Sequence, residues 1–464
     1  MNISYRSILG IAAGCGLMLS TASCSQDFLE QYPSNSITEG NFYQNDNDFD
    51  QAVRGCYAQV KSNISFHRDE LTYRGDESKQ TAMAVSTQDR YDIDHFQPIA
   101  NNGIVSDLWK KSYNGIYRCN DVLVHLNGRS DIQNAGLYRG ECLFLRAWHY
   151  FTLYRVFGVV PVTKTVVAPA DAKNIARCTE ADMYNMLVED LTEAAANLPA
   201  TPGSEKARVT SMAAQTLLAK VYLTFGKKTE AAQVLEKAMT NKYYGLETST
   251  GRVFDTGNKM NKEIIFAIYY NKTNDSGHGY WFSTSTNVEA DIVNPTMEFK
   301  AIYDRNADNR IGLITNYTKV GNLYVMQKWF DTYDAIYTTV VGNDFPHLRY
   351  ADVVLMYAEA VAPTDMTTAL KYLNMTRERA GLPNLTSEDV PDMKTFTNEL
   401  AMERGREFAL EGQRWFDLVR LGLAVEYFTE LGYNIDTNDL LFPLPQDQLE
   451  IVNNPNILWQ NPGY

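Results

Sequence analysis

A charge-rich segment, residues 401–422, has residue types that could do chemistry. It reads "AMERGREFALEGQRWFDLVRLG" and interleaves acidic residues with arginines: Glu403, Glu407, Glu411 and Asp417 with Arg404, Arg406, Arg414 and Arg420. A pair of carboxylates can act as general acid and base, and an arginine can hold an anionic substrate. One hypothesis is therefore an enzyme, such as a glycoside hydrolase with two catalytic carboxylates.

The spacing of these charges favours pairing within a scaffold. Residues three or four positions apart are neighbours on a helix. The pairs three positions apart are Glu403 with Arg406, Glu411 with Arg414, Arg414 with Asp417, and Asp417 with Arg420. Gly412 indicates close packing or a bend, because glycine inside a helix costs about 1 kcal/mol relative to alanine. We therefore interpret this segment as part of the frame of the molecule.

The sequence lacks the common motifs of catalysis and metal binding. Its six histidines include no HExxH pair, and no GxxxxGK, GxSxG or GxGxxG motif occurs. The run "DRNADNRIG", from Asp304, begins like a calcium loop, but it has no glycine at the sixth position and Thr315 replaces the closing glutamate. We expect no catalytic residues, no metal and no cofactor.

The N-terminus is typical of an exported protein with a lipid-attachment cysteine. Arg6 precedes the apolar run "ILGIAAGCGLMLS", and the small residues "TAS" precede Cys24. The apolar run is shorter than the roughly 20 residues of a membrane span. We expect a signal peptide over 1–23, lipidation at Cys24 and a tether over 24–47. An ordinary signal peptide with a chance cysteine is the alternative.

Net charge and the remaining cysteines limit the partners and the covalent structure. A formal charge of -14 argues against nucleic acid or an anionic bilayer surface as partner. The cysteines of the mature chain, Cys56, Cys119, Cys142 and Cys178, match no CxxC spacing. Buried free thiols are expected, with a bridge from Cys119 to Cys142 as the alternative.

Helical periodicity dominates the chain from residue 48 onward. Apolar residues recur at three- and four-residue steps over 209–226, and the pattern returns over 227–240, which predicts a helical hairpin. A second hairpin is predicted over 348–383, and 139–158 resembles the first helix of another. Small residues at the helix contacts resemble tetratricopeptide units. We predict one all-α domain of such hairpins over 48–464.

Two irregular stretches, at about 61–105 and 241–345, interrupt the helical pattern. The second is rich in Tyr, Asn, Thr, Gly and Asp and contains the strand-like run "EIIFAIYY". Long irregular insertions in a rigid scaffold commonly carry recognition. We therefore expect the ligand-binding residues in these insertions.

Several blocks of the sequence resemble, in order, hallmark segments of the SusD/RagB outer-membrane lipoproteins of Bacteroidetes. They are "CSQDFLEQYP", "RGECLFLRAWHYFTLYRVFGVVPV", "ERGREFALEGQRWFDLVRLG" and "LFPLPQDQLEIVNNPNILWQNPGY". Leu444, where the family more often has Ile, is a conservative departure. The resemblance implies a tetratricopeptide-like protein, lipid-anchored at the outer face of the outer membrane. It also implies a binding protein that forms a lid over a SusC-like TonB-dependent transporter and captures oligosaccharides or, in some members, peptides.

The resemblance further implies where a sugar could bind. In glycan-binding members, loop aromatics form a platform, and a pyranose has an apolar face that suits a flat ring. The corresponding candidates are Tyr73, Arg74, Asp76 and Glu77 in one stretch, Tyr280, Trp281 and Phe282 in another, and Trp329, Tyr333 and Tyr337 in a third. An assembly protein that closes a transporter without touching its cargo is a further alternative.

Overall fold

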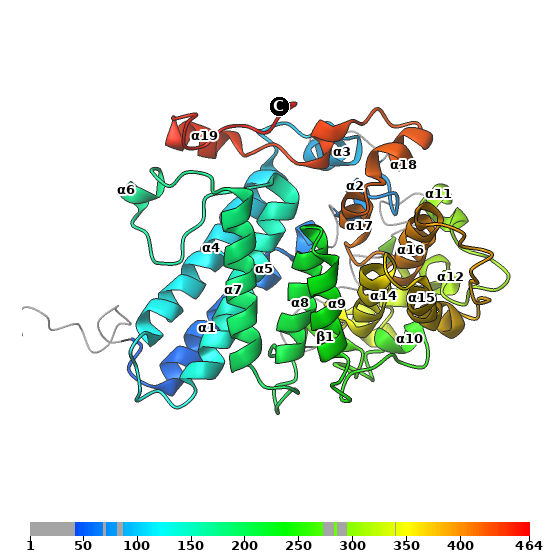
Figure 1. Cartoon of the computed structure of the whole chain (residues 1–464), viewed down its shortest axis with the longest axis horizontal. Helices are drawn as coiled ribbons and strands as arrows, with labels where there is room; N and C mark the ends of the chain where they lie inside the picture. Colours follow the sequence, from blue (N-terminus) through cyan, green and yellow to red (C-terminus); the bar gives the residue numbers. More distant parts are fainter. Residues whose placement is uncertain (1–41, 68–70, 81–86, 272–282, 285–294, 339) are drawn as a thin grey trace, which may run out of the picture.

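Four long helices form the N-terminal part of the scaffold. The computed structural model describes residues 42–464 except 68–70, 81–86, 272–282, 285–294 and 339. The four helices are α1 (Asp46–Ser62), α4 (Gly103–Leu126), α5 (Ala135–Phe157) and α7 (Glu180–Asn197). They lie side by side in Figure 1, with α5 buried along most of its length. Asn45 and Thr179 begin α1 and α7 with capping boxes, in which a side chain accepts from backbone N–H groups of the first turn.

Two helical hairpins continue this array, as the periodicity predicts. They are α8 (Ser211–Thr224) with α9 (Lys228–Ala238), and α14 (Tyr350–Val361) with α15 (Met366–Ala380). Helix α8 packs against α7, and α9 packs against α14, so the hairpins form one continuous row (Figure 1). The predicted all-α class with tetratricopeptide-like hairpins is confirmed.

The charge-rich segment is two helices rather than one. Helix α16 (Met393–Glu407) ends before the turn, and α17 (Arg414–Arg420) begins after it. Gly412 lies in the turn with φ at +67°, and a Cβ on it would stand 2.0 Å from the carbonyl oxygen of His67. The expectation of a bend or close packing at Gly412 is therefore confirmed on both counts. The chain then continues through α18 (Ala424–Glu430), η6 (Thr437–Leu440) and α19 (Gln446–Val452).

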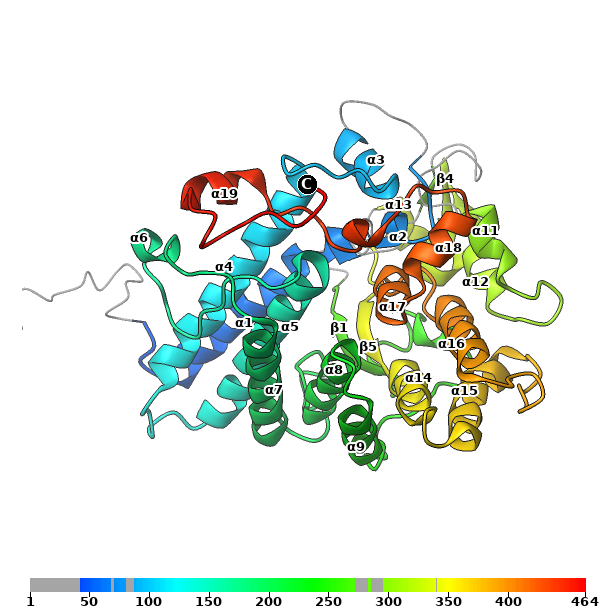
Figure 2. The ribbon, with the colours of Figure 1, turned by 45° about the horizontal axis from the view of Figure 1, so that its top comes forward.

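The irregular stretches hold short elements packed on the scaffold. The insertion at about 61–105 contains α2 (Leu71–Arg74) and α3 (Gln88–Asp94), and the segment after α5 contains α6 (Pro169–Ala172). The insertion at about 241–345 contains α10 (Thr250–Val253), α11 (Met297–Ala301), α12 (Ile311–Thr315), η5 (Gln327–Trp329) and α13 (Tyr333–Tyr337). From the turned view of Figure 2, α3 and α13 lie near the same end of the molecule as α2.

Strands occupy a small part of the second insertion. The strand-like run forms β1 (Ile264–Ile268), which pairs antiparallel with β5 (Phe345–Arg349) and is buried along its whole length. A second small sheet has the order β2-β4-β3, with β2 (Ser283–Thr284), β3 (Tyr317–Val320) and β4 (Leu323–Met326). Such short strands depend on the helices beneath them, because an isolated strand pair is marginally stable in water.

Two further expectations concern the state of the cysteines and the absence of a membrane-spanning helix. Cys56, Cys119 and Cys142 are buried free thiols, and Cys178 is a partly buried one. The alternative of a bridge between Cys119 and Cys142 is therefore wrong. Among the described residues, none of the helices has the length and apolar character to cross a bilayer.

Candidate functional site

The carboxylates of the charge-rich segment are buried in a network of ion pairs. Glu407 Oε1 accepts from Arg349 Nη1 at 2.8 Å and from Arg379 Nη2 at 2.5 Å, and its Oε2 accepts from Arg310 Nη1 at 3.0 Å. Burial alone would raise the pKa of Glu407, but the three guanidinium groups hold that pKa well below its usual value. Both oxygens of Glu407 are therefore engaged in ion pairs that join separate elements of the frame.

The pairing of this segment differs in part from the helical prediction. Asp417 pairs with Arg420 at 2.9 Å, and Glu403 lies 3.5 Å from Arg406, as the spacing predicts. Glu411, however, pairs with Lys328 and Arg349, both at 2.7 Å, and Arg414 pairs with Asp76. The turn between α16 and α17 removes Glu411 and Arg414 from a common helix, which explains why these two do not pair. The predicted pair of Arg414 with Asp417 is replaced within α17, since Arg414 reaches Asp76 and Asp417 pairs with Arg404 and Arg420.

The candidates of the first insertion are buried in the frame. Arg74 is fully buried, and its guanidinium lies over the rings of Phe96, Trp415 and Phe442 at 4.2 to 4.9 Å. Tyr73 is 2% exposed. Neither side chain offers a ring face or an open donor to a ligand at the surface.

The neighbouring carboxylates have the same character. Asp76 Oδ1 accepts from Arg414 Nε at 2.9 Å, and Glu77 Oε1 accepts from the backbone N–H of Leu410 at 2.5 Å. Burial raises the pKa of Glu77 to about 8. The expectation that Tyr73, Arg74, Asp76 and Glu77 face a ligand is therefore corrected: Tyr73 is buried, and the side chains of Arg74, Asp76 and Glu77 join the first insertion to the charge-rich segment.

The aromatic candidates of the second insertion divide into buried and exposed residues. Trp329 is fully buried against Phe254 and Phe345, with ring centroids 5.1 and 6.0 Å apart, so it belongs to the core instead of a platform. Tyr333, at the start of α13, is 60% exposed. Tyr337 ends the same helix. Tyr280, Trp281 and Phe282 lie outside the described residues.

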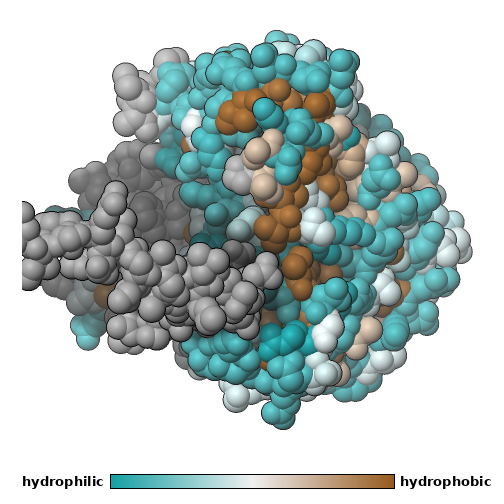
Figure 3. All heavy atoms as spheres, turned by 90° about the vertical axis from the view of Figure 1, so that its left-hand side faces the viewer, coloured by the Kyte–Doolittle hydropathy of each residue, from teal (hydrophilic) through white to brown (hydrophobic). Residues whose placement is uncertain are grey.

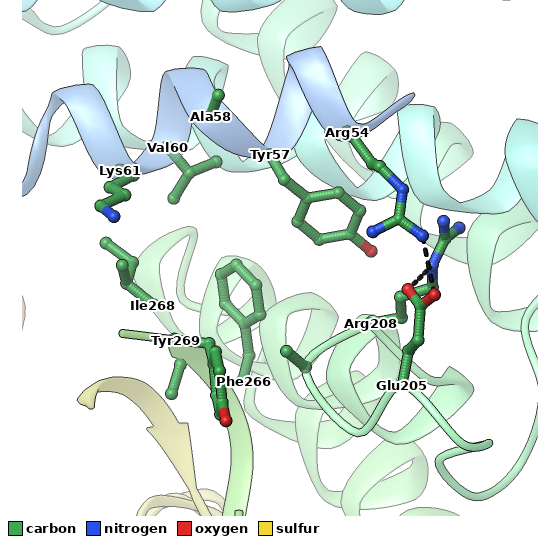
Figure 4. A pocket seen from close by; sticks show the side chains of 12 residues that line it. Arg54, Tyr57, Ala58, Val60, Lys61, Glu205, Arg208, Phe266, Ile268 and Tyr269 are labelled. Carbon is green, nitrogen blue, oxygen red and sulfur yellow. Dashed lines mark hydrogen bonds and ion pairs between the residues drawn. The ribbon is translucent and has the colours of Figure 1, made fainter. Parts of the chain in front are cut away.

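A pocket of about 300 Å³ opens between the N-terminal scaffold and the second insertion (Figure 4). Its apolar part comes from α1 and β1, with Val60, Phe266 and Ile268 among the lining side chains. Tyr269 follows β1 and lines the pocket with 46% of its surface exposed. Lys259 Nζ lies 4.0 Å from the centroid of this ring, a cation–π contact that holds the tyrosine in place.

Ion pairs link the charged side chains of the polar part of this pocket, which Figure 4 shows beside Tyr57. Glu205 Oε1 accepts from Arg54 Nη2 at 2.7 Å, and its Oε2 accepts from Arg208 Nε at 3.0 Å. Both hydrogen bonds lower the pKa of Glu205, and the one from Arg54 has the larger effect. The hydroxyl of Tyr57 donates to Glu141 Oε1 at 2.9 Å. The pocket therefore combines an apolar floor, an exposed ring and preorganised charged groups.

Of the sequence-predicted candidates that the structure describes, none lines this pocket. Arg54 and Tyr57 belong to a regular amphipathic helix, where polar residues normally face solvent, and nothing in their spacing distinguishes them. Tyr269 had a signal, since it is the first of the two tyrosines at the end of the strand-like run "EIIFAIYY", inside the insertion where recognition was expected.

The chain resembles known proteins over most of its length. A family model described as "SusD family" matches residues 297–464, and one described as "Starch-binding associating with outer membrane" matches residues 27–223. "SusD-like protein P2" of Formosa agariphila is 29% identical over 504 residues, covering 97% of this chain and 98% of that protein.

Solved structures share the fold. A SusD superfamily protein from Bacteroides vulgatus superposes with a TM-score of 0.77 at 23% identity, covering 91% of this chain and 100% of that one. The surface glycan-binding protein A from Bacteroides thetaiotaomicron, in complex with laminarihexaose, gives a TM-score of 0.74 at 21% identity over 90% of this chain and 100% of its own. The two family models, which match residues 27–223 and 297–464, and the full-length relative show that the chain belongs to the SusD/RagB family, and the solved structures show that it shares their fold.

Proposed function

We propose that this protein captures oligosaccharides at the cell surface and delivers them to a TonB-dependent transporter, without catalysing a reaction on them. The family match over 27–223, described as starch-binding, is the observation that carries the proposal. The laminarihexaose complex of a protein with this fold supports it. A peptide-binding member of the same family is the second candidate, and a glycoside hydrolase is a weaker third.

The pocket of Figure 4 suits a sugar ring chemically. The C–H face of a pyranose can stack on the exposed part of the Tyr269 ring, and a rigid ring loses little entropy on binding. The fixed pairs of Glu205 with Arg54 and Arg208 can accept from and donate to vicinal hydroxyls. We propose this pocket as a contact site for the glycan. The loop aromatics Tyr280, Trp281 and Phe282, with Tyr333 and Tyr337, remain proposed as a platform.

Calorimetry against oligosaccharides and peptides tests this assignment. We expect laminarihexaose or another oligosaccharide to bind. We expect Tyr269→Ala to weaken binding by about tenfold, since stacking of a sugar on one aromatic ring contributes on the order of 1.4 kcal/mol. Tyr243→Ala is the matched control, because Tyr243 is a similarly exposed tyrosine, at 39%, outside the pocket lining. If Trp281→Ala and Tyr333→Ala weakened oligosaccharide binding but Tyr269→Ala did not, the binding site would lie in the loops. If the protein bound only peptides, the proposal of glycan capture would be wrong.

Attachment to the outer membrane is proposed through lipid on Cys24, with no other contact of the chain with the bilayer. The family description "associating with outer membrane" supports this location. A single acyl chain binds a membrane weakly, so a stable anchor needs more than one chain or a second contact. We expect Cys24→Ala to shift the protein from the membrane fraction to the soluble fraction; unchanged membrane attachment would contradict the lipid anchor.

We propose that the transporter docks on an apolar surface of the protein. Figure 3 faces the side of the molecule that carries α4, α6 and α19, and apolar atoms form a band across it. Exposed apolar side chains of these elements and their connections are Tyr117, Val124, Val166, Ile451 and Trp459. A large exposed apolar patch on a folded protein is typical of an interaction site.

A charge placed in this surface should weaken the complex with the transporter. We expect Val166→Asp to reduce the transporter that co-purifies with the protein by about tenfold, because burying an unpaired carboxylate costs more than about 1.4 kcal/mol. Met393→Asp is the control, since Met393 on α16 is 37% exposed against 39% for Val166. Equal recovery with both variants would mean that the transporter docks elsewhere.

A further inference from the structure

A second pocket, of about 290 Å³, lies where α5, α8 and α17 meet. Its lining includes Arg155 near the end of α5, Lys220 from α8, and Phe416, Asp417 and Arg420 from α17, so its charged side chains are three cations and one carboxylate. The charge-rich segment therefore contributes one wall of a cavity in addition to its part in the frame. This pocket shares no lining residue with the pocket near Tyr269.

Arg155 makes no direct ion pair with the residues that the structure describes, although the carboxylates of Asp417 and Asp352 lie near enough to raise its pKa by attraction. Its guanidinium carbon lies 3.9 Å from the ring centroid of Phe416 and 4.4 Å from that of Phe151. Its Nε is buried and has no hydrogen-bond acceptor within the part of the chain that the structure describes. Aromatic rings stabilise the faces of a guanidinium, but its N–H donors point outward in the plane and need acceptors of their own.

The neighbouring charges leave Arg155 as an excess cation. The other charged side chains around it pair among themselves: Lys220, Arg404 and Arg420 with Asp352, Asp417 and Glu359. These three cations and three carboxylates cancel formally, so Arg155 adds one uncompensated positive charge. Burial lowers the pKa of Arg155 to about 9, which still leaves it protonated at neutral pH. A protonated guanidinium that is partly removed from water requires an anion or bound water to offset its desolvation.

We infer that this pocket binds an oxyanion, either a carboxylate or a sulfate group, through the planar N–H edge of Arg155. A guanidinium presents two parallel donors that match two oxygens of such a group. Phe416 and Phe151 fix the plane of the guanidinium, so little side-chain entropy is lost on binding. A volume of about 290 Å³ admits a small anion or one charged sugar unit. The inference does not depend on the proposed glycan capture.

Thermal unfolding with free anions tests this site directly. The wild type, Arg155→Met and Arg155→Lys are unfolded in sodium chloride, sodium sulfate and sodium glucuronate at equal ionic strength. Arg305→Met is the matched control, since Arg305 is exposed. For the wild type and the control, we expect sulfate or glucuronate to raise the unfolding midpoint by about 2–3 °C relative to chloride.

The variants separate a binding site from a structural arginine. In Arg155→Met, the anion-specific rise should disappear while the midpoint in chloride stays equal to that of the wild type or increases, because an unpaired charge has been removed. Arg155→Lys should show a smaller rise, since an ammonium lacks the two-pronged edge. A rise with sulfate alone identifies a sulfate site, and a rise with glucuronate alone identifies a carboxylate site. An anion-specific rise that persists in Arg155→Met, or none in the wild type, would overturn the inference.

Discussion

Replacing Glu407 by glutamine should lower the free energy of unfolding by about 3–5 kcal/mol, because the change breaks a buried ion network from one side. Glu407 is 1% exposed and accepts from three arginines, Arg310, Arg349 and Arg379. Glutamine has nearly the same shape but offers one oxygen and an NH₂ group that would face guanidinium donors. Urea unfolding at neutral pH measures the loss.

The control for this change is Glu430→Gln, which removes the same charge at an exposed position of α18. Surface substitutions of this kind usually change stability by less than about 0.5 kcal/mol. An equal effect of both variants would mean that the loss comes from net charge. A stability of Glu407→Gln equal to the wild type would contradict the role of the network in the frame.

Gly412→Ala should destabilise the protein by at least about 4 kcal/mol. Single substitutions reach so large a loss only through a severe fault in the interior, such as a steric conflict. A Cβ at this position would stand 2.0 Å from the carbonyl oxygen of His67, and φ is +67°. The backbone of His67 cannot move away freely, since its side chain packs against Trp148 and His347 with ring centroids 5.6 and 5.1 Å apart. The variant should unfold at a much lower denaturant concentration or accumulate as insoluble protein.

A substitution at Gly422 separates the cost of the steric conflict from the cost of the positive φ. Gly422 also has a positive φ, +72°, but a Cβ there would meet no atom within 4 Å. Gly422→Ala should therefore cost only the backbone strain of about 1–2 kcal/mol. If Gly412→Ala cost no more than Gly422→Ala, the close approach of His67 to the turn between α16 and α17 would be wrong.

Local periodicity was sufficient to predict the helical hairpins. The apolar spacing around α8, α9, α14 and α15 specifies one buried face for each helix, and that property depends on neighbours within a few residues. Pairs at i and i+3 on a single helix were also predictable, and the pair of Asp417 with Arg420 forms as expected.

Partners that are distant in the chain were not predictable in this way. Arg414 pairs with Asp76, 338 positions away, and the turn at Gly412 directs it there. Trp329 stands in a polar insertion that is typical of surface loops, yet Phe254 and Phe345 cover it. The polar character of a stretch does not reveal which of its aromatic residues the fold buries, since burial depends on elements elsewhere in the chain. For the same reason, sequence spacing did not find Tyr269 or the isolated charge of Arg155.

The central claim is that the charge-rich segment holds a frame and that the glycan binds elsewhere. The most direct test is to titrate Glu407→Gln and the wild type calorimetrically, under conditions where both are folded, with the oligosaccharide that the wild type binds most tightly. We predict dissociation constants within about twofold of each other, a difference of about 0.4 kcal/mol, together with the lower unfolding free energy described above. A dissociation constant raised tenfold or more at unchanged stability would contradict the claim and place the segment in the binding site.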